Sequence, residues 1–138
     1  MNKLYVCVVD DDEVVRFNIA KKLSRLDCTV RAFESGEDLV EFLKNQEREP
    51  DVILMDYKMS GMNGLETLQA VRKFSSIPTI IFTAYEGLVD VQAVKRLGRC
   101  EVMLKTVDLN ILGHIVNGAM AVRKLGTMSQ VDSGSSQS

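Results

Sequence analysis

Short apolar runs and longer amphipathic segments alternate along this chain. The runs are rich in large apolar residues, and several are apolar throughout, which is typical of strands buried on both faces of a sheet. The run at 28–33 instead alternates apolar and polar residues, as a half-exposed strand does. We predict strands at residues 4–9, 28–33, 51–56, 78–83 and 101–105.

The segments between these runs have the periodicity of helices with one apolar face. In the first segment, apolar residues recur at three- and four-residue spacing. The second opens with Ser35 as a helix cap and Asp38 in the capping-box position, and it ends in the charged segment 44–49. We predict the other helices at residues 13–26, 65–73, 87–97 and 107–125.

This alternation predicts an α/β protein with a doubly wound parallel sheet and helices on both of its faces. The length of 138 residues, 46% of them hydrophobic and 26% charged, suits one such domain. Residues 126–138 are rich in Ser and Gly and lack periodicity, so we expect a disordered tail or linker there. The folded domain is therefore predicted to span residues 1–125.

Charge and composition exclude several classes of protein. A net charge of −2 offers no basic excess to attract nucleic acid or an anionic membrane. The apolar runs are far shorter than the roughly 18–20 residues that a membrane span needs, so we expect a cytoplasmic protein. The 3 cysteines form no CxxC pair and lie in or beside apolar runs, which predicts free buried thiols.

Chemically active side chains stand where the predicted strands end. Parallel α/β sheets bind ligands beyond the carboxyl ends of their strands, so residues far apart in sequence should converge there. Carboxylates without His or Cys suit a hard cation, most of all Mg²⁺, and a carboxylate can also be the nucleophile in phosphoryl transfer. The ammonium group of a lysine can neutralise the charge of phosphoryl oxygens, and the hydroxyl of a threonine can donate a hydrogen bond to them. The strand-end residues are Asp10, Asp11, Asp56, Thr83 and Lys105.

With these strand-end residues, the sequence resembles the receiver domain of two-component response regulators, the chemotaxis-regulator type. The resemblance covers about residues 3–124, in order and with the spacing of that family. It is carried by VVDDDE at 8–13 with Arg16, ILMDYKMSGMNG at 53–64, PTIIFTA at 78–84, Gly98 and the pair Leu104-Lys105.

The resemblance implies a flavodoxin-like sheet with strand order 2-1-3-4-5 and a Mg²⁺-dependent phosphoacceptor. Asp56 would be the residue that takes the phosphoryl group and would also contact the metal. Asp11 would bind Mg²⁺ directly, Asp10 mainly through water, and Lys58 through its backbone carbonyl. Gly64 would end the loop beneath the site.

The resemblance also implies a switch and its partners. Thr83 would be the switch hydroxyl, and Lys105 would hold the phosphoryl group. A sensor histidine kinase or a histidine phosphotransfer protein would be the donor. An output domain or protein would bind the surface made by the fourth helix, fifth strand and fifth helix, and a phosphorylation-dependent homodimer would be compatible with it. Such a domain is no turnover enzyme, because it catalyses only its own phosphorylation and dephosphorylation.

Three positions depart from the pattern of the family. Thr106 stands where a proline usually follows the lysine, so the position of Lys105 is open to change. Val102 replaces the usual aromatic residue, so the common aromatic rotamer switch cannot operate. Ser60 replaces the usual proline after Met59, which should loosen the loop at little cost.

Two alternatives remain at the level of sequence. A degenerate receiver would act as a constitutive interaction module; Val102 and Thr106 favour it, and the intact strand-end residues oppose it. A haloacid-dehalogenase-type phosphatase would use the DDDEV segment at 10–14, with Thr83 and Lys105 as its next motifs. That reading lacks the acidic pair expected after Lys105 and leaves Asp56 unexplained.

Overall fold

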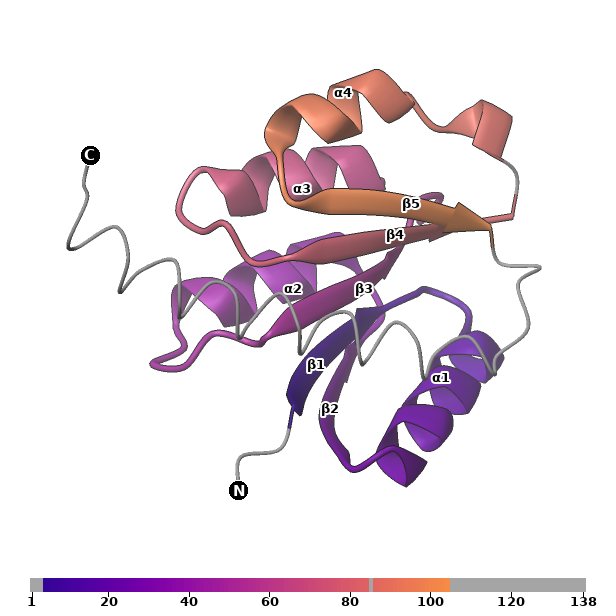
Figure 1. The fold of residues 1–138 in the computed structure, drawn as a ribbon, viewed down its shortest axis with the longest axis vertical. Coiled ribbons are helices and arrows are strands. Elements are labelled where there is room, and N and C mark those ends of the chain that lie inside the picture. The colour runs from indigo at the N-terminus through magenta and orange to yellow at the C-terminus, as the bar shows by residue number, and fades with distance from the viewer. Residues whose placement is uncertain (1–3, 85, 105–138) are drawn as a thin grey trace, which may run out of the picture.

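The computed structural model describes residues 4–84 and 86–104, which form alternating strands and helices (Figure 1). The predicted elements in this part of the chain are present, and most of their bounds agree within two residues. In chain order the elements are β1 (Leu4–Val9), α1 (Glu13–Arg25), β2 (Cys28–Phe33), α2 (Gly36–Lys44), β3 (Val52–Asp56), α3 (Gly64–Arg72), β4 (Thr79–Thr83), the 3₁₀ turn η1 (Glu86–Leu88), α4 (Val91–Leu97) and β5 (Cys100–Leu104).

The strands form one five-stranded parallel sheet in the order β2-β1-β3-β4-β5, which confirms the predicted fold class. Residue pairing brings the carboxyl ends of the inner strands to the same level. Val9 of β1 pairs with Met55 of β3, and Asp56 pairs with Phe82 of β4. Thr83 in turn pairs with Leu104, the last residue of β5. The side chains that end these strands therefore share one edge of the sheet.

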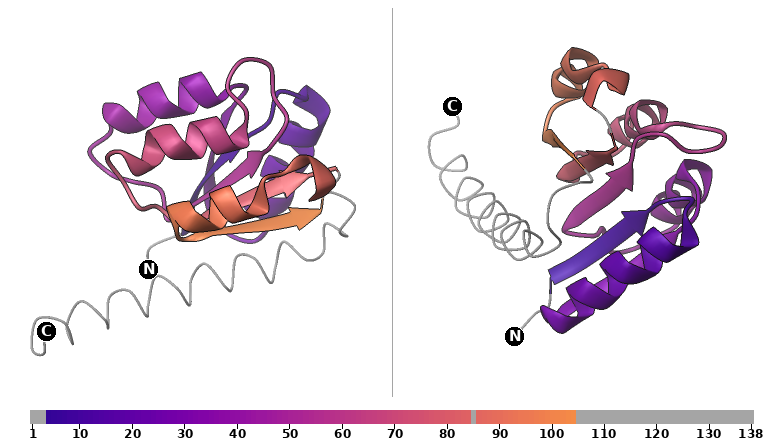
Figure 2. Two further views of the ribbon diagram at one scale, coloured as in Figure 1. Left: turned by 90° about the horizontal axis from the view of Figure 1, so that it is seen from above. Right: turned by 90° about the vertical axis from the view of Figure 1, so that its right-hand side faces the viewer.

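Helix α1 covers one face of the sheet and helices α2, α3 and α4 cover the other (Figure 2), and each face has its own hydrophobic core. On one face, Leu39 of α2, Leu68 of α3 and Val94 of α4 pack against alternate residues of the strands. On the other face, Ile19 and Leu23 of α1 do the same. Every residue of β1 is buried, because this interior strand has a core on both of its faces. Within residues 4–84 and 86–104, no helix is long and apolar enough to cross a membrane.

The segment before β5 is the main departure from the predicted elements. The periodicity predicted a single helix over 87–97, whereas η1 and α4 are separate. Asp90 causes the break, because its side chain accepts a hydrogen bond from the Ala93 amide at 3.0 Å and so caps a new helix. The predicted helix at 107–125 and the tail at 126–138 lie outside the described residues, so both remain predictions. The thiols of Cys7, Cys28 and Cys100 are buried and free, as predicted.

Candidate functional site

Three carboxylates gather at the carboxyl edge of the sheet. Asp10 follows β1 directly, Asp11 comes next, and Asp56 is the last residue of β3. One carboxylate oxygen from each lies within 4.8 Å of the others. The Asp10 and Asp56 side chains are buried, with 2% and 6% of their surface exposed, whereas Asp11 faces solvent. We call this group of two buried carboxylates and one exposed carboxylate the acidic pocket.

The acidic run at 10–13 divides into site residues and a helix cap. The Asp12 carboxylate accepts hydrogen bonds from the amides of Val14 and Val15, so it begins α1. The Asp10 carboxylate accepts a hydrogen bond from the Asp12 amide at 2.9 Å. Arg16, one turn into α1, donates to the Asp10 carbonyl at 2.7 Å. The start of α1 therefore fixes the turn that carries Asp10 and Asp11, whereas Asp12 caps the helix.

The loop between β3 and α3 begins directly after Asp56. The end of the loop lies close to its beginning, because the Gly64 amide donates a hydrogen bond to the Tyr57 carbonyl at 2.6 Å. A Cβ atom on Gly64 would lie 3.0 Å from the Asp56 carbonyl oxygen, so the close approach favours glycine. Asn63 begins α3 in a capping box with Glu66. Both ends of the loop are thereby anchored to regular structure.

The chemistry of the donor set suits a divalent cation that prefers oxygen. Charge repulsion among three carboxylates this close is relieved when a cation lies between them. Mg²⁺ binds proteins through one or two carboxylates, keeps several waters, and completes its shell with phosphate oxygens. The mixture of buried Asp10 and Asp56 with exposed Asp11 leaves one side open for those waters and for a phosphoryl group.

The other predicted site residues have different outcomes. Thr83 is buried at the end of β4, beside the strand that ends in Asp56. Lys58 lies in the loop after Asp56 with an exposed side chain. Val102 is half-buried and packs against the core cluster beneath α2, α3 and α4. Lys105, like Thr106, lies outside the described residues, so its role as a phosphate clamp stays a prediction.

Two contacts of this loop were not predicted from the sequence. The Ser60 amide donates to Oδ2 of Asp11 at 3.2 Å, and the Met62 amide donates to Oε2 of Glu37, in the first turn of α2, at 3.0 Å. For Ser60 there was a signal, because the proline usual in the related pattern has no amide hydrogen to donate. For Glu37 no residue type announced the contact, since an acid in the first turn of a helix is common on dipole grounds alone.

Comparisons with known proteins agree with this geometry. The family model described as "Response regulator receiver domain" matches residues 6–117. The DNA-binding transcriptional regulator NtrC of Escherichia coli (strain K12) is 30% identical over 122 residues, which make up 88% of this chain and 26% of that protein. The Regulator of RpoS of the same strain is 33% identical over 113 residues, covering 80% of this chain and 33% of that protein.

Solved structures give the same result for the fold. The N-terminal domain of a response regulator/sensory box/GGDEF 3-domain protein from Carboxydothermus hydrogenoformans superposes with a TM-score of 0.79 at 26% identity, over 89% of this chain and 98% of that one. This chain spans only about a quarter to a third of the two curated relatives named above. The family match, the strand order and the acidic pocket together show that the chain belongs to the receiver domains of two-component response regulators.

Proposed function

We propose that this receiver domain takes a phosphoryl group on Asp56 and uses the resulting charge to change its binding partners. The observation that carries the proposal is the gathering of Asp10, Asp11 and Asp56 within 4.8 Å at the carboxyl edge of the sheet. Asp11, Asp56 and the backbone carbonyl of Lys58 would hold Mg²⁺, and Asp10 would act mainly through water. When bound, Mg²⁺ supplies positive charge that stabilises the transferring phosphoryl oxygens.

In the reaction, a carboxylate oxygen of Asp56 attacks the phosphorus atom of a phosphohistidine. A new O–P bond forms as the P–N bond breaks, and the leaving imidazole nitrogen keeps the electron pair and takes a proton from solvent. Thr83, at the end of β4, would donate its hydroxyl to a phosphoryl oxygen, and Lys105 would supply a balancing charge. The domain is consumed as a substrate and regenerated by hydrolysis, so it acts as a switch.

Phosphorylation adds about −2 of charge and three acceptor oxygens, which is enough to bias a two-state element. The exposed apolar side chains of Leu88 and Val91, at η1 and the start of α4, support a partner surface beside β5. We infer that an output domain or protein binds there, and that a histidine kinase or phosphotransfer protein is the donor. The family assignment leaves no support for the phosphatase reading, while the constitutive interaction module remains the competing hypothesis.

Intact mass spectrometry after incubation with acetyl phosphate and Mg²⁺ tests this proposal. Wild type should gain one phosphate-sized adduct, and Asp56→Ala or added EDTA should abolish it. An adduct that survives in Asp56→Ala would place the acceptor elsewhere. A wild-type protein without any adduct would favour the interaction module.

A further inference from the structure

The loop of residues 57–63 is held in its middle by two carboxylates that come from opposite sides. The carboxylate of Asp11, in the turn after β1, accepts a hydrogen bond from the Ser60 amide at 3.2 Å. Glu37, from the first turn of α2, accepts the Met62 amide at 3.0 Å. The two bonded amides are separated by Gly61 alone. One of the two carboxylates belongs to the acidic pocket, whereas Glu37 does not.

The contact of Glu37 is close as well as directional. A Cβ atom built on Gly61 would lie 2.5 Å from Oε2 of Glu37, so the carboxylate rests against the backbone of that glycine. Gly61 has a φ angle of +79°, in the region that glycine adopts without strain. The loop therefore takes a sharp path at the point where the Glu37 carboxylate meets it. A larger residue at 61 would disturb both the path and the contact.

The path of this loop determines the geometry of the pocket. The loop begins directly after Asp56, and Met59 anchors it by burying its side chain in the core beneath α2 and α3. The Ser60 amide then reaches Asp11, so a shift of the loop moves a hydrogen-bond donor of that carboxylate. The carbonyl of Lys58, which we expect to bind the metal, lies in the same short segment. Groups that orient metal ligands in this way commonly alter metal affinity about 10- to 100-fold when removed.

We propose that Glu37 is a positioning residue for phosphorylation, which acts through the loop by holding the Ser60 amide and the Lys58 carbonyl in place for Mg²⁺. This inference rests on the proposed function of the pocket. Glu37 lies outside the described group of three carboxylates, so we expect it to act indirectly. It is also exposed, so its loss should alter metal affinity far more than it alters folding.

Three variants separate the hydrogen bond from the charge. Glu37→Ala removes both, and Glu37→Gln keeps an oxygen that can accept the Met62 amide. Asp38→Ala is the matched control, because Asp38 is the neighbouring exposed acid in the same first turn of α2. Mg²⁺ dissociation constants come from amide NMR titration, and acetyl phosphate supplies the phosphorylation rate at low and at saturating Mg²⁺.

We expect Glu37→Ala to weaken Mg²⁺ binding by about tenfold, the lower end for an indirect group. Its phosphorylation should slow by a similar factor at low Mg²⁺ and recover at saturating Mg²⁺. Glu37→Gln and Asp38→Ala should stay within about twofold of wild type. The melting temperatures of Glu37→Ala and Asp38→Ala should fall alike, since each removes one first-turn acid.

Equal Mg²⁺ affinities for Glu37→Ala and Asp38→Ala would overturn the positioning role, while phosphorylation of wild type on Asp56 would leave the proposed function standing. A Glu37→Gln variant as weak as Glu37→Ala would also overturn it, because charge rather than the hydrogen bond would then be responsible. Wild type that binds no Mg²⁺ would remove both the inference and the proposed function.

Discussion

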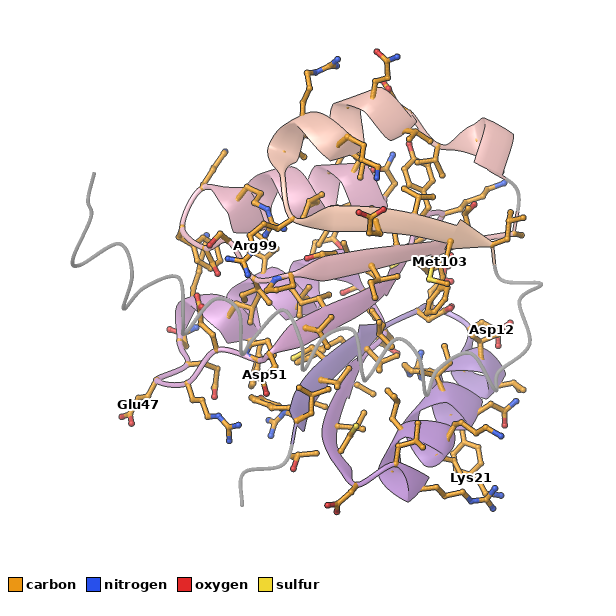
Figure 3. All side chains as sticks on the ribbon, viewed as in Figure 1. Asp12, Lys21, Glu47, Asp51, Arg99 and Met103 are labelled. Carbon is orange, nitrogen blue, oxygen red and sulfur yellow. The ribbon has the colours of Figure 1, made fainter. Side chains whose placement is uncertain are left out.

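The two edges of the sheet hold charged groups in different ways; Figure 3 labels Asp51 and Arg99 near the amino edge and Asp12 near the carboxyl edge. At the amino edge, the Arg72 guanidinium donates to the Gly98 carbonyl at 3.0 and 3.2 Å and to the Arg99 carbonyl at 3.2 Å. At the same edge, the Asp51 carboxylate accepts a hydrogen bond from the Tyr5 amide at 2.7 Å. These charged groups find partners in the backbone, and they connect α3 to the start of β5 and β3 to β1.

At the carboxyl edge, the described part of the chain instead gathers three carboxylates in one place. One carboxylate oxygen each of Asp10, Asp11 and Asp56 lies within 4.8 Å of the others. A charged group that is bonded to the backbone of another element stabilises the fold, whereas three carboxylates gathered in one place also repel one another, and a cation relieves that repulsion. The gathering of carboxylates is therefore the physical reason to expect a cation at the carboxyl edge.

The largest expected effect on stability is at the amino edge. Arg72→Met keeps the apolar stem and removes the guanidinium, which leaves several carbonyls without their donor. The free energy of unfolding, measured with urea, should fall by about 2 kcal/mol. Mg²⁺ affinity should stay unchanged, because the carboxyl edge is untouched. Lys73→Met, an exposed neighbour, is the control; a comparable loss in that control would mean that the Arg72 contacts contribute little.

Alkaline pH offers a second test of the amino edge. Burial raises the pKa of the Cys100 thiol, at the start of β5, to about 12, and the charge of nearby Arg72 opposes this only in part. The unfolded chain then loses this proton near pH 9 while the folded chain keeps it, so stability falls as pH rises. Between pH 8 and 10 the loss should be about 1 kcal/mol per such thiol. Burial also raises the pKa of Cys7 to about 12.

Urea unfolding at several pH values measures this slope. Cys100→Ala should reduce the slope and leave the part that Cys7 contributes. A slope that does not change in Cys100→Ala would show that this thiol ionises in the folded protein much as it does in the unfolded one.

The smallest expected effect on stability has the opposite sign and lies at the carboxyl edge. Asp11→Asn removes one of the three gathered charges and keeps an oxygen for the Ser60 amide. In EDTA the free energy of unfolding should rise by about 0.5–1 kcal/mol, as repulsion is relieved. Mg²⁺ binding should weaken at least tenfold in the same variant. Glu34→Gln, an exposed acid outside the cluster, should change neither quantity. A loss of stability in Asp11→Asn would contradict the account of the carboxyl edge.

The sequence predicted those features of the fold and of the site that depend on the local pattern of apolar and polar residues. The apolar run of β1, the Ser35 cap of α2 and the strand-end positions of Asp10 and Asp56 follow from periodicity and from the geometry of parallel sheets. The start of α4 was wrong, because apolar periodicity continues across Asp90 and does not reveal that its side chain caps a new helix.

The contacts that define the loop could not be predicted. Glu37 and Met62 are 25 residues apart, and Ser60 and Asp11 are 49 apart. In each pair the donor is a backbone amide, which every residue except proline carries, so no residue type marks it. Such contacts depend on the path of the loop in three dimensions, and only the structure supplies that path.

A crystal structure of the protein with Mg²⁺ and beryllofluoride tests the central claim most directly. The account predicts fluoroberyllate on a carboxylate oxygen of Asp56, with Mg²⁺ about 2.0–2.1 Å from oxygens of Asp11 and Asp56. Fluoroberyllate on another residue, or Mg²⁺ bound away from these carboxylates, would contradict it.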